Sequence, residues 1–128
     1  MSSRFAASSR YPRKIADVDP HLMSLQTPRR YPRFVVERPL RITVFWEDMP
    51  IRKVHGVCHV LGEGGLGATV ADDLYLGDVV SVEMPPITRT YARIRNIRGI
   101  RKGFEFLQLS DTQRHAVRRL CELSNRPA

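Results

Sequence analysis

The chain has 128 residues, of which 42% are hydrophobic and 27% charged, so its length and composition fit one soluble globular domain and exclude two domains of ordinary size. No apolar run approaches the roughly 20 residues that a membrane-spanning helix needs, so we expect no membrane insertion and a cytoplasmic location. The net charge of +8 predicts attraction to polyanions, a class that includes nucleic acids, membrane surfaces and phosphorylated small molecules.

The beginning of the chain is basic and has no sustained hydrophobic period. Residues 1–33 contain seven Lys and Arg against two Asp, with many Ser, Pro and Ala between them. Such a composition cannot bury enough apolar surface to fold by itself. We therefore expect a disordered basic tail over residues 1–27 and a folded domain over residues 28–124.

From Pro39 onward the pattern is that of β-strands. Leu40, Ile42 and Val44 alternate with polar or larger residues, which places them on one face of a strand. Similar alternation between turn-forming residues predicts six strands, at about residues 40–46, 52–61, 66–71, 78–84, 88–97 and 103–109. Six strands with short connections favour a small antiparallel barrel, because closure removes the exposed edges of an open sheet.

The last part of the chain has the features of a helix. Ser110 and Gln113 fit a capping box, in which each side chain binds the backbone N–H of the other residue. The helix is expected to run to about Ser124, with an apolar stripe of Val117, Leu120 and Cys121. The predicted fold class is therefore all-β with one helix, a six-stranded antiparallel β-barrel with a C-terminal α-helix.

The second strand contains the first of two cysteines. Strict alternation places Val57, His59 and Leu61 on one face of this strand, with Cys58 on the other. Neither Cys58 nor Cys121 belongs to a CxxC motif or a Cys/His cluster, so we expect reduced thiols and no metal site. No serine or cysteine is accompanied by the base and orienting group that a nucleophile needs, so we expect no enzymatic activity.

A glycine-rich turn lies between the second and third strands. The run from Gly62 to Gly67 satisfies GxGxxG, but no helical pattern follows it, which excludes the βαβ unit of dinucleotide-binding folds. Two interpretations of Gly62, Gly64 and Gly65 stay open. They could let backbone N–H groups approach a phosphate, or they could supply the positive φ angles of a tight turn.

The order of these features resembles the PilZ domain over about residues 28–123. The RxxxR motif of that family, just before its first strand, is matched by Arg29 and Arg33. A Gly-led strand in the middle of the family's domain is matched by residues 77–84, and a final strand near a Gly-x-x-Phe pattern, followed by a helix, is matched by Gly103 and Phe106.

The second motif of the family, (D/N)xSxxG at the end of the second strand, is matched in part. Gly65 supplies its closing glycine, while Val60 and Gly62 stand at its two polar positions. A valine cannot present a polar group to guanine or phosphate. This departure motivates an alternative function, a degenerate PilZ module that binds a protein partner through an apolar patch containing Val60 and Leu61.

The resemblance implies a receptor for cyclic di-GMP in bacterial second-messenger signalling, with a downstream protein partner and no further cofactor. Arg29 and Arg33 would be the principal ligand groups and Arg30 would assist, against a second wall formed by Gly62, Glu63, Gly64 and Gly65. Arginine suits this task because its planar fork can bind phosphate or the edge of guanine. Without the resemblance, these arginines would be interpreted as a solvated basic linker.

Four further expectations concern the residues of this site and its possible partners. Glu63 should oppose a phosphate unless it points at the N–H edge of guanine, and His59 is either a ligand contact or an ordinary histidine of the barrel face. The arm over residues 28–34 should become ordered only with ligand, because like charges repel one another within it. Nucleic-acid binding is not expected, because aromatic residues are not interleaved with the arginines as on a stacking platform.

Overall fold

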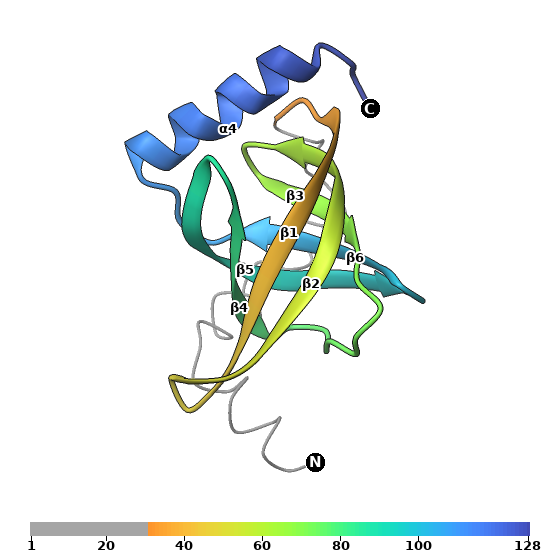
Figure 1. Cartoon of the computed structure of the whole chain (residues 1–128), viewed down its shortest axis with the longest axis vertical. Coiled ribbons are helices and arrows are strands. Elements are labelled where there is room, and N and C mark those ends of the chain that lie inside the picture. Colours follow the sequence, from red (N-terminus) through yellow and green to blue (C-terminus); the bar gives the residue numbers. More distant parts are fainter. Residues whose placement is uncertain (1–30) are drawn as a thin grey trace, which may run out of the picture.

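The computed structural model describes residues 31–128, which form a closed antiparallel barrel with one helix (Figure 1). The elements are β1 (Phe34–Trp46), β2 (Met49–Gly62), β3 (Gly65–Thr69), β4 (Val79–Met84), β5 (Ile87–Arg98), β6 (Arg101–Phe106) and α4 (Asp111–Ser124). Neighbouring strands pair in the order β1-β2-β3-β6-β5-β4, and β4 pairs again with β1 to close the barrel. The predicted fold class is confirmed.

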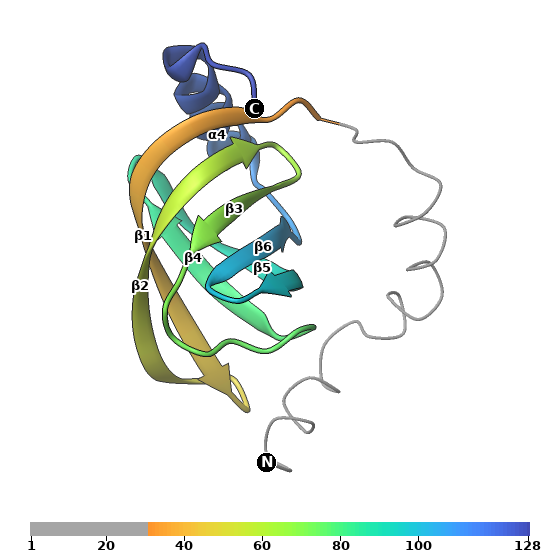
Figure 2. The same cartoon turned by 90° about the vertical axis from the view of Figure 1, so that its right-hand side faces the viewer.

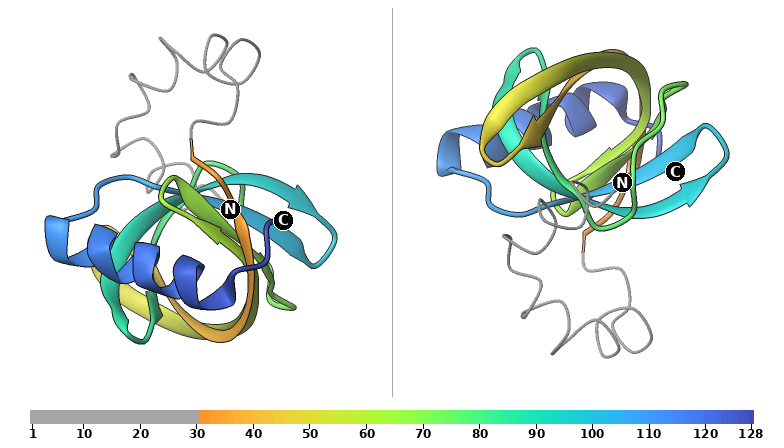
Figure 3. Two further views of the ribbon diagram at one scale, coloured as in Figure 1. Left: turned by 90° about the horizontal axis from the view of Figure 1, so that it is seen from above. Right: turned by 90° about the horizontal axis from the view of Figure 1, so that it is seen from below.

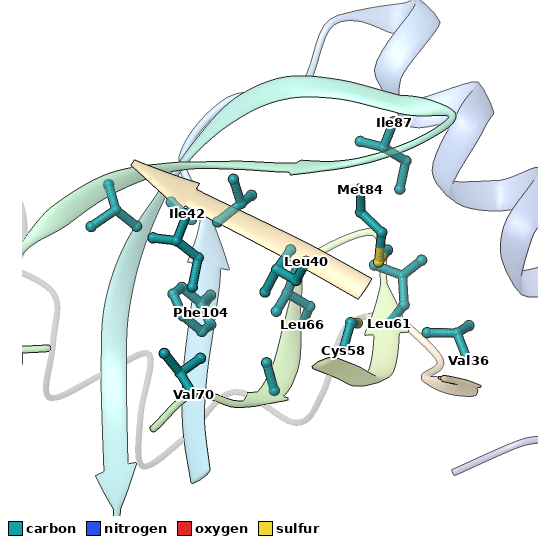
Figure 4. Packing of buried hydrophobic residues seen from close by; sticks show 14 of the residues in the cluster. Val36, Leu40, Ile42, Cys58, Leu61, Leu66, Val70, Met84, Ile87 and Phe104 are labelled. Carbon is teal, nitrogen blue, oxygen red and sulfur yellow. The ribbon is translucent and has the colours of Figure 1, made fainter. Parts of the chain in front are cut away.

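Alternating residues of each strand fill the barrel. Leu40, Ile42 and Val44 of β1 are at most 3% exposed, as their spacing predicts. Figure 4 shows Leu40 and Ile42 pointing toward Leu66 and Phe104 from the opposite side of the barrel. Complete burial of such a side chain stabilises a fold by about 1.5–3 kcal/mol, so this shared core is what holds the strands in one closed sheet.

The second strand departs from strict alternation. Cys58 and Leu61 are both fully buried although they are three residues apart, while Val57 is 41% exposed. The pairing of β2 with β3 skips His59, which is an extra residue in a β-bulge. The predicted face that grouped Val57 with Leu61 is therefore wrong, because a one-residue bulge moves every later side chain to the other face.

The first strand begins earlier than predicted because the end of the chain pairs with it. The backbone N–H of Val35 donates to the carbonyl of Arg126 at 2.7 Å, and the N–H of Ala128 donates to the carbonyl of Arg33 at 2.9 Å. Figure 2 shows the C-terminus beside the start of β1. These contacts satisfy backbone groups that the predicted strand, starting near Pro39, would have left without partners.

Helix α4 closes one end of the barrel, as seen from above in Figure 3. Its buried residues are those of the predicted stripe, Val117, Leu120 and Cys121. The capping box is also present, with Gln113 N–H donating to Ser110 Oγ at 3.1 Å and Ser110 N–H donating to Gln113 Oε1 at 2.8 Å. Both predictions for this helix are confirmed.

An ion-pair cluster ties α4 to the turn between β2 and β3. The Glu63 carboxylate accepts hydrogen bonds from Arg118 Nε at 2.9 Å and from Arg114 Nη1 at 3.3 Å. The side chain of Glu63 is only 19% exposed. The hydrogen bond from Arg118, and then that from Arg114, hold the pKa of Glu63 below its usual value despite partial burial.

The two cysteines belong to the core. Both are free and buried, and burial raises the pKa of Cys58 to about 12 and that of Cys121 to about 11. Such thiols are not reactive at neutral pH. Within residues 31–128 no cluster of His, Cys, Asp or Glu could hold a metal ion, and no helix is long and apolar enough to cross a membrane.

A pair of glycine substitutions on β3 tests the close contact between β3 and β6. A Cβ at Gly65 would lie 2.0 Å from the Phe104 carbonyl oxygen, whereas a Cβ at Gly67, on the same face, would meet only the Val60 Cβ at 3.8 Å. We expect Gly65→Ala to cost about 1–3 kcal/mol and Gly67→Ala to leave stability near that of the wild type. Urea denaturation midpoints measure this difference, and equal midpoints would contradict the contact.

The cluster around Glu63 makes a prediction about pH. Its carboxyl pKa is lower in the folded chain than in the unfolded one, so the stabilisation is present above about pH 4.3 and is lost as the pH falls through the folded pKa. Glu63→Gln should therefore lower the melting temperature at neutral pH, and the difference from wild type should shrink in acid. Glu47→Gln, which changes an exposed carboxylate in the turn between β1 and β2, is the control and should show no such convergence.

Candidate ligand-binding groove

An open groove of about 1010 Å³ lies on the outer face of the barrel, over β3, β6 and the end of β5. Figure 2 shows these three strands side by side. The groove begins at Tyr31 and Arg33, passes over the turn between β2 and β3, and ends at the turn between β5 and β6. Its lining includes four of the predicted site residues besides Arg33, namely Gly62, Glu63, Gly64 and Gly65.

The glycines of the turn are required for close approach, not for an unusual backbone angle. None of Gly62, Gly64 and Gly65 has a φ in the left-handed region, so the positive-φ interpretation is wrong. A Cβ at Gly62 would lie 2.7 Å from the carbonyl oxygen of Pro32, closer than any side chain can tolerate. The absence of a side chain at Gly62 therefore lets the segment before β1 lie directly on the turn.

The same contacts place the end of the predicted arm. The ring of Tyr31 lies 3.3 Å from the position of a Cβ at Gly64, and Arg33 and Phe34 contact the C-terminal residues. Residues 31–34 are therefore built into the fold by contacts with the protein itself. The expectation that only a ligand orders the arm is wrong for this part, and residues 28–30 lie outside the described part of the chain.

One of the three predicted arginines is placed by the structure. Arg33 is exposed and lines the groove next to the glycine turn. Arg29 and Arg30 lie outside the described residues, so their role stays a prediction. A guanidinium at the position of Arg33 can reach a phosphate or a base edge in the groove from the side of β1.

His59 lies on the barrel face, away from the groove lining. Its Nδ1 is 3.0 Å from the Glu37 carboxylate, and its Nε2 is 2.7 Å from Thr69 Oγ1. Both ring nitrogens are therefore engaged by neighbouring strands. Of the two interpretations of His59, this geometry favours the histidine of the barrel face.

Glu63 has partners within the protein itself. Its carboxylate is directed to Arg114 and Arg118 of α4, although Glu63 still lines one side of the groove. Because two guanidinium groups balance its charge, Glu63 opposes an anion less than an isolated carboxylate would.

Basic side chains outnumber acidic ones along the groove by six to two, the basic ones being Arg33, Arg95, Arg98, Arg101, Lys102 and Arg114. The acidic residues are Glu63 and Glu105, and Glu105 accepts from Arg95 at 3.2 Å. A shallow, basic surface of this kind can bind an anionic ligand of nucleotide size.

Sequence reasoning missed the wall of the groove formed by β5 and β6, which contributes Asn96, Arg98 and Arg101. The available signal was the high density of arginines in β5 and β6. These arginines are followed by Gly103, which faces outward. That signal could not be assigned to the site because the pairing of β6 with β3 was not known from sequence.

Comparison with known proteins supplies the family. The PilZ domain model matches residues 27–123. No curated protein matches the sequence.

Several solved structures are similar to the chain, three of which follow. The PilZ domain of YcgR from Escherichia coli, solved with c-di-GMP, is 20% identical with a TM-score of 0.59, over 77% of this chain and 92% of that one. The inhibitor of motility MotI/DgrA of Bacillus subtilis is 18% identical with a TM-score of 0.60, over 76% of this chain and 51% of that one. The PilZ domain of CeSA from a cellulose-synthesizing bacterium is 21% identical with a TM-score of 0.53, over 70% of this chain and 94% of that one.

The likeness to these structures agrees with the barrel and its helix, and the family model covers most of the folded chain. The chain belongs to the PilZ domain family.

Proposed function

We propose that this PilZ domain is a cytoplasmic receptor for cyclic di-GMP that acts in bacterial signal transduction. The observation that carries the proposal is the basic groove beside Arg33 and the Gly62–Gly65 turn, the two places where the family motifs fall in this chain. The likeness to the PilZ domain of YcgR, which was solved with c-di-GMP, supports the same ligand.

The chemistry of the groove suits this ligand. Cyclic di-GMP carries two phosphodiester charges and two guanine bases, and the excess of guanidinium groups along the groove offers charge-assisted hydrogen bonds to both kinds of group. The groove is also large enough, since sites for small ligands commonly measure about 300–1,000 Å³. Its open shape allows a ring-shaped dinucleotide to lie along the sheet.

The proposal includes binding without catalysis. Among residues 31–128, the groove lining contains no serine, cysteine or histidine, and its two carboxylates, Glu63 and Glu105, are bound to arginines. Cyclic di-GMP incubated with the protein should therefore be recovered unchanged by chromatography. Appearance of a linear dinucleotide would contradict this part of the proposal.

Calorimetric titration with cyclic di-GMP tests the proposed ligand. We expect saturable binding by the wild type, and a loss of about 10- to 100-fold in affinity for Arg33→Ala, because a hydrogen bond to a charged group contributes about 1.5–3 kcal/mol. Arg119→Ala is the matched control, since Arg119 is exposed on α4 and does not line the groove. No heat up to about 100 μM ligand, a concentration well above micromolar dissociation constants, would overturn the proposal.

A second function, protein binding without nucleotide, is favoured by Val60 and Gly62, which place no polar side chain at the turn. One part of that prediction is wrong, because Leu61 is fully buried and cannot belong to an apolar surface patch. Val60 is half-buried and lines the groove beside Gly67.

Affinity capture from a bacterial lysate, with and without added cyclic di-GMP, separates the two functions. The receptor should retain a partner in a nucleotide-dependent way, and this dependence should disappear in an Arg29→Ala, Arg33→Ala double variant. A partner that wild type and double variant retain equally, whether or not nucleotide is added, would favour the nucleotide-independent module.

A further inference from the structure

The floor of the groove has two paired glycines where β3 meets β6. Gly67 and Gly103 are directly opposite each other in this pair. At Gly67 neither backbone nor packing requires glycine, because its φ is not in the left-handed region and a Cβ would meet only the Val60 Cβ at 3.8 Å. Glycine weakens the interior of a strand and often marks a place where a ligand approaches the backbone closely. Gly67 pairs with Val60 next to the bulge of β2, and no side chain of its own covers its backbone on the groove side.

Asn96 of β5 lies next to the glycine pair, Gly67 and Gly103. A Cβ at Gly103 would come within 2.6 Å of Asn96 Nδ2, so the Asn96 amide lies over Gly103. The side chain is exposed, and its amide has no hydrogen-bond partner among residues 31–128. Both a donor and an acceptor are thus available at the edge of the floor.

Arg98 and Arg101 stand next to Asn96, at the turn between β5 and β6. They are directly opposite each other in the strand pair, and both are exposed. Like charges in this arrangement destabilise a sheet, and neither guanidinium has an acidic partner in the described part of the chain.

Hydrogen bonds from Lys102 hold the turn that carries these arginines. The buried Lys102 ammonium donates to the carbonyls of Gly99 at 2.9 Å and Val70 at 2.8 Å. Its charge adds to those of Arg98 and Arg101, so the turn is both fixed in position and strongly positive. An anion bound between the two arginines would relieve their repulsion.

We propose that Asn96, Arg98 and Arg101, with the bare backbone at Gly67, form a second binding wall that holds one purine base and one phosphate of the ligand. This inference rests on the proposed function. A planar base lies flat on the backbone at Gly67, the Asn96 amide binds the edge of that base, and the two arginines bind the phosphate. The wall supplies polar groups from β5 and β6 that Val60 and Gly62 do not supply from β2.

Calorimetry with cyclic di-GMP tests this wall with matched variants. The Arg98→Ala, Arg101→Ala double variant should bind about 10- to 100-fold more weakly than wild type, because it loses charge-assisted hydrogen bonds. The control is Arg89→Ala, Arg119→Ala, which removes the same charge from exposed arginines outside the groove lining. Gly67→Val is an independent test that keeps every arginine and fills the floor, and it should weaken binding without lowering the melting temperature.

The outcomes separate this inference from the proposed function. If the wild-type protein does not bind cyclic di-GMP, both the receptor function and the second wall are overturned. Binding that requires Arg33, but is equally strong in the Arg98/Arg101 variant and in its control, overturns the second wall and leaves the receptor function standing. Weaker binding by both the Arg98/Arg101 variant and Gly67→Val, with melting temperatures no lower than that of wild type, supports the wall.

Discussion

The backbone at the turn between β2 and β3 is approached from three sides, and the rest of the site depends on this contact. Pro32 lies on Gly62, the carbonyl of Phe104 in β6 lies against Gly65, and Glu63 between them binds the helix. A side chain at either glycine would separate elements that are distant in sequence. The turn therefore fixes the segment before β1, the width of the β3–β6 floor and the position of α4 together.

The sequence predicted the elements well because local chemistry determines them. Alternation predicted the strands, and the Ser110–Gln113 capping box predicted the start of α4. The sequence did not predict which distant segments contact one another. The extra residue at His59 changes the face of each later side chain of β2, and no pattern within one strand indicates a bulge that depends on its neighbours. The bond from Arg118 to Glu63 joins residues 55 positions apart, which local reasoning cannot anticipate.

Because long-range contacts cannot be predicted from local patterns, the sequence also does not show which arginines belong to the site. A net charge of +8 predicts an anionic partner, but it does not say which arginines are available to bind one. In the folded chain Arg95 binds Glu105, and Arg114 binds Glu63, so these arginines are largely balanced by their neighbours. The positive field of the groove then comes mostly from the remaining basic groups, and the pairing of strands decides where those groups lie.

The placement of residues 31–34 changes the energetics expected for a ligand. Ordering one residue costs about 1–2 kcal/mol of backbone entropy, so a ligand that had to order these four residues would lose about 4–8 kcal/mol of its binding energy. In this fold Tyr31 packs on the glycine turn, and Arg33 and Phe34 pair with the C-terminal residues, so this entropy is lost on folding and not on binding. For the proposed ligand, the contacts of residues 31–34 and the hydrogen bonds of Lys102 to the turn between β5 and β6 would both reduce the entropic cost of binding, because neither part would have to be assembled by the ligand. Under the proposed function, an anionic dinucleotide would therefore need fewer polar contacts from β2 than the family motif provides.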